Sequence, residues 1–184
     1  KLKDYKRALN IGCLYQNPLR GTAPNLTIEE NLALAYTRKA SPSFFALNKK
    51  DSAYFREVLS TLGMGLEDRM KTKIGLLSGG QRQAASLLMA TIAEPELLLL
   101  DEHTAALDPG AAEKVMALTK KIVEENKITT LMITHDMEYA LEYGSRTIML
   151  DSGKIVMDLT GKEREEMTTG KLAELFYGKA HKKG

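Results

Sequence analysis

The sequence has little of what marks disulfide-bonded, membrane-spanning or nucleic-acid-binding proteins. Its single cysteine, Cys13, excludes an internal disulfide and suits a reducing compartment. A net charge of +2, with 27% charged residues, is too balanced to indicate nucleic-acid binding. The most apolar run, Leu97–Leu100, is far too short to cross a bilayer and is closed by Asp101. We therefore expect an ordinary globular chain of one domain, or of one domain with a subdomain.

A Ser-Gly-Gly turn precedes a long helical pattern in the middle of the chain. Ser78 is a typical N-cap residue, and the glycines after it relax the entry into the helix. The backbone N–H groups of Gly79, Gly80 and Gln81 would also lie at the positive end of that helix, where a phosphate binds well. These residues alone leave both interpretations open, a plain helix start and a phosphate contact.

Two acidic residues end the apolar run. Asp101 and Glu102 follow Leu97–Leu100, which we expect to be a buried strand. Acidic residues at a strand end are commonly only solvated. In an α/β sheet, however, ligands bind at strand ends, where one carboxylate can hold Mg²⁺ and its neighbour can orient an attacking water.

Strand and helix patterns alternate along the chain, which is typical of an α/β fold. Thr27 and Glu30 form a capping box that opens a helix toward Tyr36. We expect further strands over 11–15, 97–100 and 129–134, and a strand pair over 146–150 and 154–159. Further helices are expected over 51–62 and 111–126, from the cap Asp136 to about 143, and in part over 163–177. A break is expected over 41–50 and an unstructured tail over 181–184.

One strand residue and one helical stripe are expected to lie in the core. Cys13 is interpreted as a small core side chain on a strand. A helical stripe is expected to face inward over 51–62, made of Ala53, Tyr54, Val58, Leu59 and Leu62.

Together, the motifs and their order resemble the ATP-binding cassette (ABC) family, and they cover nearly the whole chain. The resemblance makes Leu77–Gln81 the signature motif, Leu97–Glu102 the Walker B strand, Ala106–Pro109 the D-loop, Gln16 the Q-loop residue and His135 the switch histidine.

The resemblance implies an ATPase that works as a head-to-tail pair, with ATP and Mg²⁺ as cofactors. Glu102 would polarise the attacking water and His135 would contact the γ-phosphate, while Gln16 and Asp101 would hold Mg²⁺. The nucleotide would also contact residues of the signature motif and D-loop, namely Ser78, Gly79, Gly80, Gln81 and Asp108.

One motif of the family is missing. No Gly-x-x-x-x-Gly-Lys-Ser/Thr sequence, the Walker A phosphate loop, precedes the Q-loop. The expected fold class is therefore α/β, an incomplete P-loop NTPase (ABC ATPase) core at 1–15 and 94–184, with a helical signature subdomain inserted at 16–93. We interpret the chain as a fragment that is inactive alone. It also departs from the family pattern at His103, Ala106 and Met89, where proline, serine and arginine are usual.

The resemblance also implies partners and a location. They are a second ABC ATPase subunit in a homodimer, membrane permease subunits and a solute-binding protein, at the cytoplasmic face of the membrane, with no nucleic acid. Residues 102–106 and 21–25 resemble ATPases of bacterial small-solute importers of the amino-acid type. Two alternatives remain: an ABC-type ATPase of DNA maintenance or repair, and a degenerate cassette that lends its signature motif to a partner without hydrolysing ATP.

Overall fold

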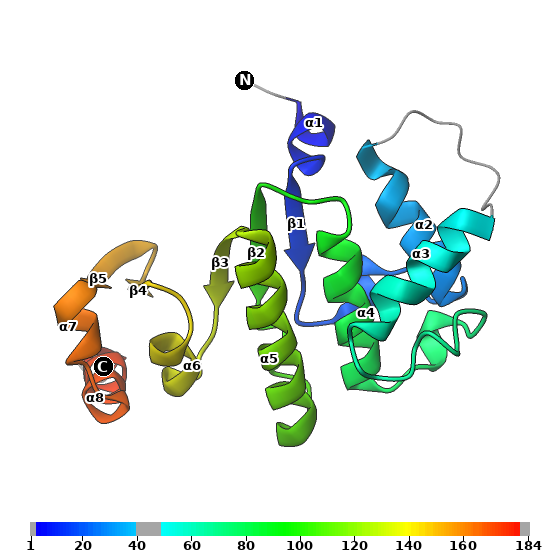
Figure 1. The fold of residues 1–184 in the computed structure, drawn as a ribbon. Coiled ribbons are helices and arrows are strands. Elements are labelled where there is room, and N and C mark those ends of the chain that lie inside the picture. The colour runs from blue at the N-terminus through cyan, green and yellow to red at the C-terminus, as the bar shows by residue number, and fades with distance from the viewer. Residues whose placement is uncertain (1–2, 40–48, 181–184) are drawn as a thin grey trace. The chain divides into compact units, whose positions relative to one another are not determined.

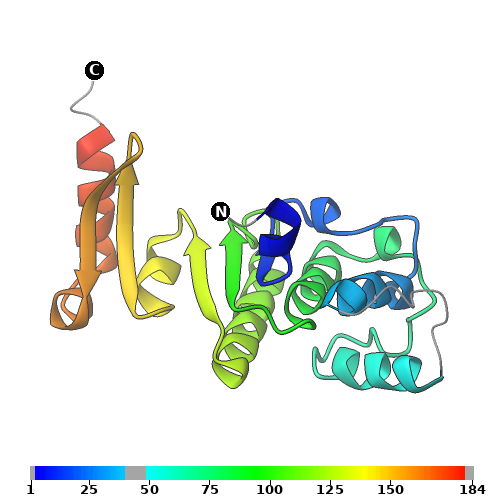
Figure 2. The same cartoon turned by 90° about the horizontal axis from the view of Figure 1, so that it is seen from above.

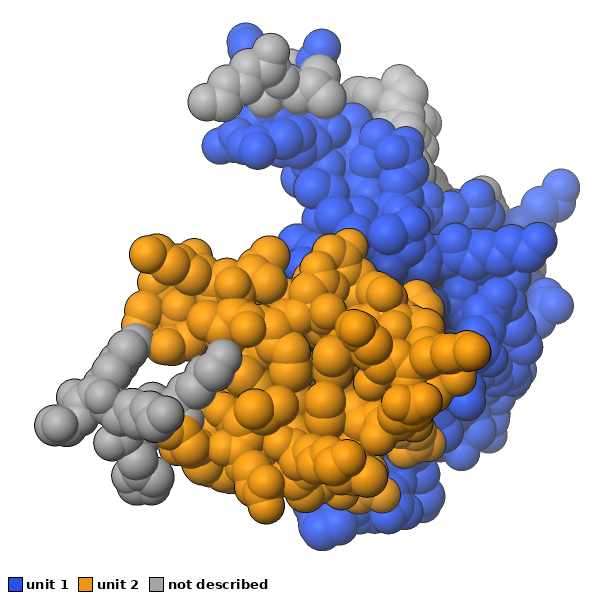
Figure 3. All heavy atoms as spheres, turned by 90° about the vertical axis from the view of Figure 1, so that its left-hand side faces the viewer, with its two compact units in different colours: residues 1–133 blue, residues 134–184 orange. Residues whose placement is uncertain are grey.

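The computed structural model describes residues 3–39 and 49–180. The chain forms two compact units, residues 1–133 and 134–184, which Figure 3 colours separately. The break expected over 41–50 lies outside the described residues except at its end, where α3 already begins at Lys49, and the tail over 181–184 lies wholly outside them. The predicted division at residues 15 and 93 differs from the boundary between these units, and it stays a prediction.

The first unit combines a parallel sheet with helices packed beside it (Figure 1). Its elements in chain order are α1 Asp4–Ala8, β1 Ile11–Leu14, the 3₁₀ turn η1 Pro18–Gly21, α2 Ile28–Tyr36, η2 Thr37–Lys39, α3 Lys49–Ser60, η3 Ile74–Leu76, α4 Gly79–Thr91, β2 Leu97–Asp101, α5 Pro109–Asn126 and β3 Thr129–Ile133. The strands and the α2, α3, α4 and α5 helices expected from the sequence are thus confirmed, within a few residues at each end.

The sheet has the strand order β1-β2-β3, and all of its pairs are parallel. On β2, Leu98 and Leu100 are buried, as expected for the central strand. The register pairs Leu14 with Leu100, so the chain beyond each strand brings Gln16 level with Glu102. The carboxyl edge of this sheet is therefore the place where the sequence-predicted acidic and amide groups meet.

The helices α2, α3 and α4 gather on the β1 side of the sheet in both views (Figures 1 and 2). A side chain on Gly12 of β1 would come within 2.5 Å of the carbonyl oxygen of Ala90, so glycine is needed for the close approach of β1 to α4. The predicted capping box at the start of α2 is present, because Thr27 Oγ1 accepts from the N–H of Glu30 while the Glu30 carboxylate accepts from the N–H of Thr27.

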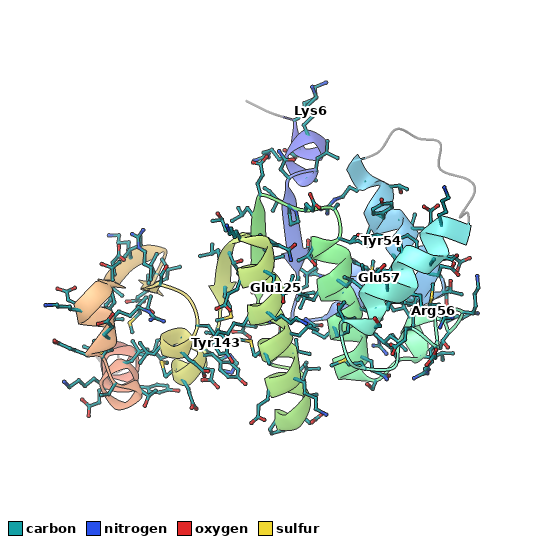
Figure 4. The ribbon with its side chains drawn as sticks, in the orientation of Figure 1. Lys6, Tyr54, Arg56, Glu57, Glu125 and Tyr143 are labelled. Atoms are coloured by element: carbon teal, nitrogen blue, oxygen red, sulfur yellow. The ribbon has the colours of Figure 1, made fainter. Side chains whose placement is uncertain are left out.

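The stripe predicted for α3 is wrong in part. Leu59 and Leu62 are buried, but Ala53 and Tyr54 are exposed and Phe55 is buried instead. Tyr54, labelled in Figure 4, packs its ring 5.3 Å from the ring of Tyr36 on α2 rather than in the core. Phe55 therefore takes the place in the core that the periodicity had given to Tyr54. Cys13 is likewise only half-buried, because one face of β1 lines a surface groove.

In its described part, residues 134–180, the second unit contains a two-stranded antiparallel sheet and three helices. Its elements are α6 Met137–Glu142, β4 Arg146–Asp151, β5 Lys154–Thr160, α7 Gly161–Glu165 and α8 Thr169–Ala180. Ser152 and Gly153 both have positive φ angles, 51° and 76°, as a tight hairpin turn requires, so the predicted strand pair is confirmed. In the described part of the chain, no helix is both long and apolar enough to cross a membrane.

Candidate functional site

The side chains of the predicted Q-loop residue and the predicted Walker B glutamate are hydrogen-bonded to each other. Gln16 donates from Nε2 to Oε2 of Glu102 at 3.3 Å, although 86 positions separate the two residues. Gln16 follows the end of β1, and Glu102 follows the end of the neighbouring strand β2, so the parallel pairing of these strands brings the two side chains together.

The backbone at Glu102 is unusual for a residue with a side chain. Its φ angle is 44°, in the left-handed region that L residues seldom adopt. The N–H of Glu102 donates to the carbonyl oxygen of Ile133 at 3.0 Å, which ties this bend to the end of β3. Strained residues held by their surroundings gather at functional sites, so the bend supports a role for Glu102 beyond packing.

The oxygen atoms at this edge fit Mg²⁺. Asp101 ends β2 with an exposed side chain, and Gln16, whose nitrogen faces Glu102, keeps its Oε1 as an acceptor. Among the described residues no three His, Cys, Asp or Glu side chains cluster as a metal cage. Magnesium does not require such a cage, because it is bound through one or two carboxylates together with water and substrate phosphates.

The signature residues form the first turn of α4. Ser78 caps this helix, and its Oγ accepts from the N–H of Gln81 at 3.3 Å. This cap uses the Gln81 N–H in the structure, and a contact of that N–H with a phosphate stays a prediction. The N–H groups of Gly79 and Gly80 have no carbonyl within the helix to bond to, and the Ser78 hydroxyl can still donate its own hydrogen.

The signature turn lies against the D-loop of the same chain. A side chain on Gly80 would come within 3.0 Å of the Ala111 Cβ, and one on Gly79 within 3.3 Å of the Leu107 side chain. Asp108 caps α5 by accepting from the N–H of Ala111 at 3.0 Å. Gly80 is buried, so close packing is one reason for a glycine there, in addition to any phosphate contact.

The predicted switch histidine belongs to the second unit. His135 is exposed and follows β3, and Asp136 caps α6 as expected by accepting from the N–H groups of Glu138 and Tyr139. The predicted site residues therefore fall into three places: Gln16, Asp101 and Glu102 at the sheet edge, the signature residues beside Asp108, and His135 in the second unit.

His103, one of the departures from the family pattern, is a buried structural residue. Its side chain is 2% exposed, and burial lowers its pKa from 6.5 to about 4, so the ring is neutral at physiological pH. His103 is adjacent to Glu102 in sequence and contacts Thr119 on α5, and it thereby anchors the segment after Walker B to that helix.

Three buried or half-buried polar side chains that support the site were missed. Asn31 holds the loop after the Q-loop, with Oδ1 accepting from the N–H of Ala23 at 2.8 Å. Gln83 on α4 donates to the carbonyl oxygen of Tyr15 at 3.3 Å, next to Gln16. Arg82 donates to the carbonyl oxygens of Ile74, Gly75 and Leu77, in the segment that leads into α4. A polar residue on the inward face of a helix was the only sequence signal available for Asn31 and Gln83.

Comparison with known proteins decides the family. The profile described as ABC transporter matches residues 3–105. The tyrosine transport ATP-binding protein of Clostridioides difficile (strain R20291) is 42% identical over 175 residues, which are 95% of this chain and 70% of that protein. The chain belongs to the ABC transporter family. It is an ABC transporter ATP-binding protein, and its α/β fold is that of the family's ATPases.

Other ABC transporter proteins are similar over most of the chain. The phosphonates import ATP-binding protein PhnC 2 of Oceanobacillus iheyensis is 35% identical over 152 residues, 81% of this chain and 58% of that protein. A solved inward-facing conformation of a transporter of the metal-chelate type superposes with a TM-score of 0.71 and 25% identity, covering 91% of this chain and 64% of that one. The chain thus spans about two thirds of the length of these ABC proteins.

Proposed function

We propose that this ABC protein is the nucleotide-binding subunit of a transporter, and that it couples ATP binding and hydrolysis at a head-to-tail dimer interface to solute transport. The observation that carries the proposal is the contact of Gln16 with Glu102 at the carboxyl edge of the sheet. It supports a shared site for a metal-holding amide and a catalytic carboxylate. The phosphate loop required for this activity would come from residues outside the present sequence.

Each side chain has a distinct role in the proposed site. Glu102 accepts a proton from the attacking water, as a general base does. Asp101 and Gln16 would hold Mg²⁺, which would neutralise charge on the phosphates. Ser78, Gly79, Gly80 and Gln81 contact the nucleotide that the partner subunit holds. His135 contacts the γ-phosphate of the nucleotide that is hydrolysed. Asp108, beside the signature turn, senses the opposite site across the interface.

Replacing the catalytic carboxylate tests this proposal. In the full-length protein, Glu102→Gln keeps the shape of the side chain but removes the base, so turnover should fall about 10²- to 10⁴-fold while ATP binding persists. Steady-state phosphate release and equilibrium nucleotide binding measure the two effects. Hydrolysis near the wild-type rate would mean that another residue is the general base, and His135 would be the next candidate.

The transported solute in this proposal is an amino acid with an aromatic side chain. Support comes from the similarity to the tyrosine transport ATP-binding protein, which extends over 95% of this chain. Partners are then a second cassette, permease subunits and a solute-binding protein, and the site of action is the cytoplasmic membrane face. Stimulation of the assembled transporter's ATPase by tyrosine with its binding protein, and not by phosphonate, would distinguish this solute class.

The permease is proposed to dock on residues 17–36. Pro18–Gly21 forms η1, and Leu19 and Leu26 are 40% and 36% exposed. Asn31 fixes the conformation of this loop through hydrogen bonds with both the N–H and the carbonyl oxygen of Ala23. The loop therefore offers a preformed surface. Replacing Leu19 and Leu26 by serine should abolish co-purification with the permease while basal ATPase persists. Unchanged assembly and transport would leave this loop as a connection only.

A further inference from the structure

The helix that follows the predicted switch histidine is too short to be stable alone. α6 has 6 residues, whereas isolated helices shorter than about 12 residues are marginal in water. Its position must therefore come from contacts with the rest of the second unit. His135 lies directly before Asp136, the N-cap residue of this helix, so the contacts that hold α6 also determine where the backbone of His135 lies.

The start of α6 is fixed on both sides of His135. Thr134 Oγ1 accepts from the N–H of Asp136 at 3.0 Å, which closes a turn around the histidine. The Asp136 carboxylate accepts in turn from the N–H groups of Glu138 and Tyr139, at 2.8 and 3.1 Å. These bonds make His135 part of the helix start, so a shift of α6 would shift the histidine with it.

The end of α6 is held by an arginine from another element. Arg164 on α7 donates from Nη2 to the carbonyl oxygens of Leu141 and Tyr143, at 2.6 and 3.0 Å. Tyr143, labelled in Figure 4, directly follows the last residue of α6. The last carbonyl groups of a helix have no partner inside it, and a basic side chain can satisfy them. Arg164 therefore replaces hydrogen bonds that a further helical turn would supply.

Thr147 on β4 connects the same arginine to the sheet of the second unit. Its hydroxyl hydrogen is given to the carbonyl oxygen of Ala140 at 2.7 Å, so its oxygen accepts from Nε of Arg164 at 3.0 Å. Thr147 is buried, so these bonds are shielded from water. The hydrogen bonds of Arg164 thus join α6 and β4 to α7, all within the second unit.

We propose that Arg164 is a positioning residue for His135: it fixes α6 on the second unit and so holds the histidine ring in the orientation that meets the γ-phosphate. The inference rests on the proposed function, in which His135 makes that contact. Arg164 bonds the end of α6 opposite to His135 and therefore acts through the helix, not on the nucleotide. Without Arg164 the helix loses the hydrogen bonds at its end and should fray, so the histidine would sample more than one orientation.

A double-mutant cycle in the full-length protein tests this role. Arg164→Gln should lower kcat for ATP hydrolysis by up to about 100-fold, as a misplacement of about 1 Å can do, with KM for ATP nearly unchanged. In a protein that already carries His135→Ala, the same replacement should cost nothing further, because its effect passes through the histidine. Arg164→Lys should cost less, because lysine can still donate to a carbonyl oxygen but lacks the planar fork that also reaches Thr147.

Arg146→Gln is the matched control. Arg146 is an exposed arginine of the same unit that pairs with Asp158 across β4 and β5, and no hydrogen bond of its side chain to α6 is found among the described residues. Its replacement should leave kcat unchanged.

A spectroscopic readout separates positioning from folding. In the full-length Glu102→Gln protein, ATP with Mg²⁺ should shift the imidazole NMR signal of His135, which is identified by its loss in His135→Ala. Adding Arg164→Gln should reduce that shift while equilibrium ATP binding stays the same. If Arg164→Gln is poorly folded, Arg164→Lys serves for both measurements.

The outcomes separate this inference from the proposed function. Equal losses of kcat with and without His135, or an unchanged shift of the imidazole signal, would overturn the role of Arg164. A normal kcat for Arg164→Gln beside a low kcat for His135→Ala would do the same and leave the proposed function intact. A wild-type rate for His135→Ala would instead refute the contact of His135 with the γ-phosphate, and this inference with it.

Discussion

The ring of His103 donates from Nε2 to the hydroxyl oxygen of Thr119 at 3.2 Å. The direction follows from Thr119, whose only hydroxyl hydrogen is given to the carbonyl oxygen of Val115 at 2.8 Å, so that its oxygen can only accept from the ring. Burial lowers the pKa of this ring to about 4, so the ring is neutral, with its hydrogen on Nε2. Protonation would place a second hydrogen on the buried ring, where burial disfavours the charge.

Folding stability should fall in acid because of this histidine. The pKa of His103 is lowered from 6.5 to about 4, so the unfolded chain gains a proton at a pH where the folded chain does not. His103 leaves the free energy of unfolding unchanged above pH 6.5. As the pH falls from 6.5 toward 4, that free energy decreases by ~3 kcal/mol in all. Urea unfolding at pH 7 and pH 4.5 should show a smaller acid loss for His103→Gln than for wild type. Parallel losses in the two proteins would contradict the assignment.

The outer strand of the sheet should promote self-association of this chain. Among the described residues of the first unit, β3 pairs only with β2, and Leu131 and Ile133 on β3 are 54% and 53% exposed. Parallel strands are normally covered on both faces, and an open apolar edge invites pairing with another chain. Light scattering should therefore detect oligomers that Leu131→Lys with Ile133→Lys reduces. Leu76→Lys, on an isolated leucine 72% exposed, is the control and should change nothing.

A sharp monomer peak for this chain, with cooperative melting at high temperature, would contradict the expected self-association. It would indicate that the exposed face of β3 is tolerated in water.

Local signals in the sequence predicted most of the elements, because helix ends are determined by neighbouring residues. Thr27, Ser78 and Asp136 all cap helices as their positions indicate. The buried face of α3 could not be predicted, since Tyr54 and Phe55 are both large and adjacent, and only the packing of the whole core shows that Phe55 is the one covered. The hydrogen-bond partners of Asn31 and Gln83 lie on chain segments that folding brings close, so the roles of these two residues could not be predicted from the sequence.

Replacing Gln16 should raise the Mg²⁺ concentration that ATP hydrolysis requires, while the stability of the fold stays nearly the same. Gln16 is exposed and makes its described side-chain contact only with Glu102, so Gln16→Ala should change unfolding free energy by less than about 0.5 kcal/mol. In the full-length protein it should raise the Mg²⁺ concentration required for half-maximal ATPase activity. Gln83→Ala, which removes only the support behind Tyr15, should have a smaller effect on that concentration. An unchanged Mg²⁺ dependence would remove Gln16 from the metal site.

The present chain alone should not hydrolyse ATP. Its sequence contains no phosphate loop, whose lysine and backbone N–H groups cradle the β- and γ-phosphates in P-loop enzymes. Phosphate release by the purified chain should stay at the level of a buffer blank. Mg²⁺-dependent turnover that Glu102→Gln abolishes would show that other residues of this chain supply the cradle.

The molecular mass of the full-length Glu102→Gln protein in solution, with and without ATP, tests the head-to-tail arrangement most directly. The Ser78 hydroxyl and the first turn of α4 are proposed to close over the partner's nucleotide, so ATP should convert monomer to dimer when hydrolysis is blocked. Adding Ser78→Arg to this protein should keep it monomeric, because the larger side chain blocks the partner's phosphates. A monomer with ATP in the single variant, or an ATP-dependent dimer in the double variant, would contradict the account.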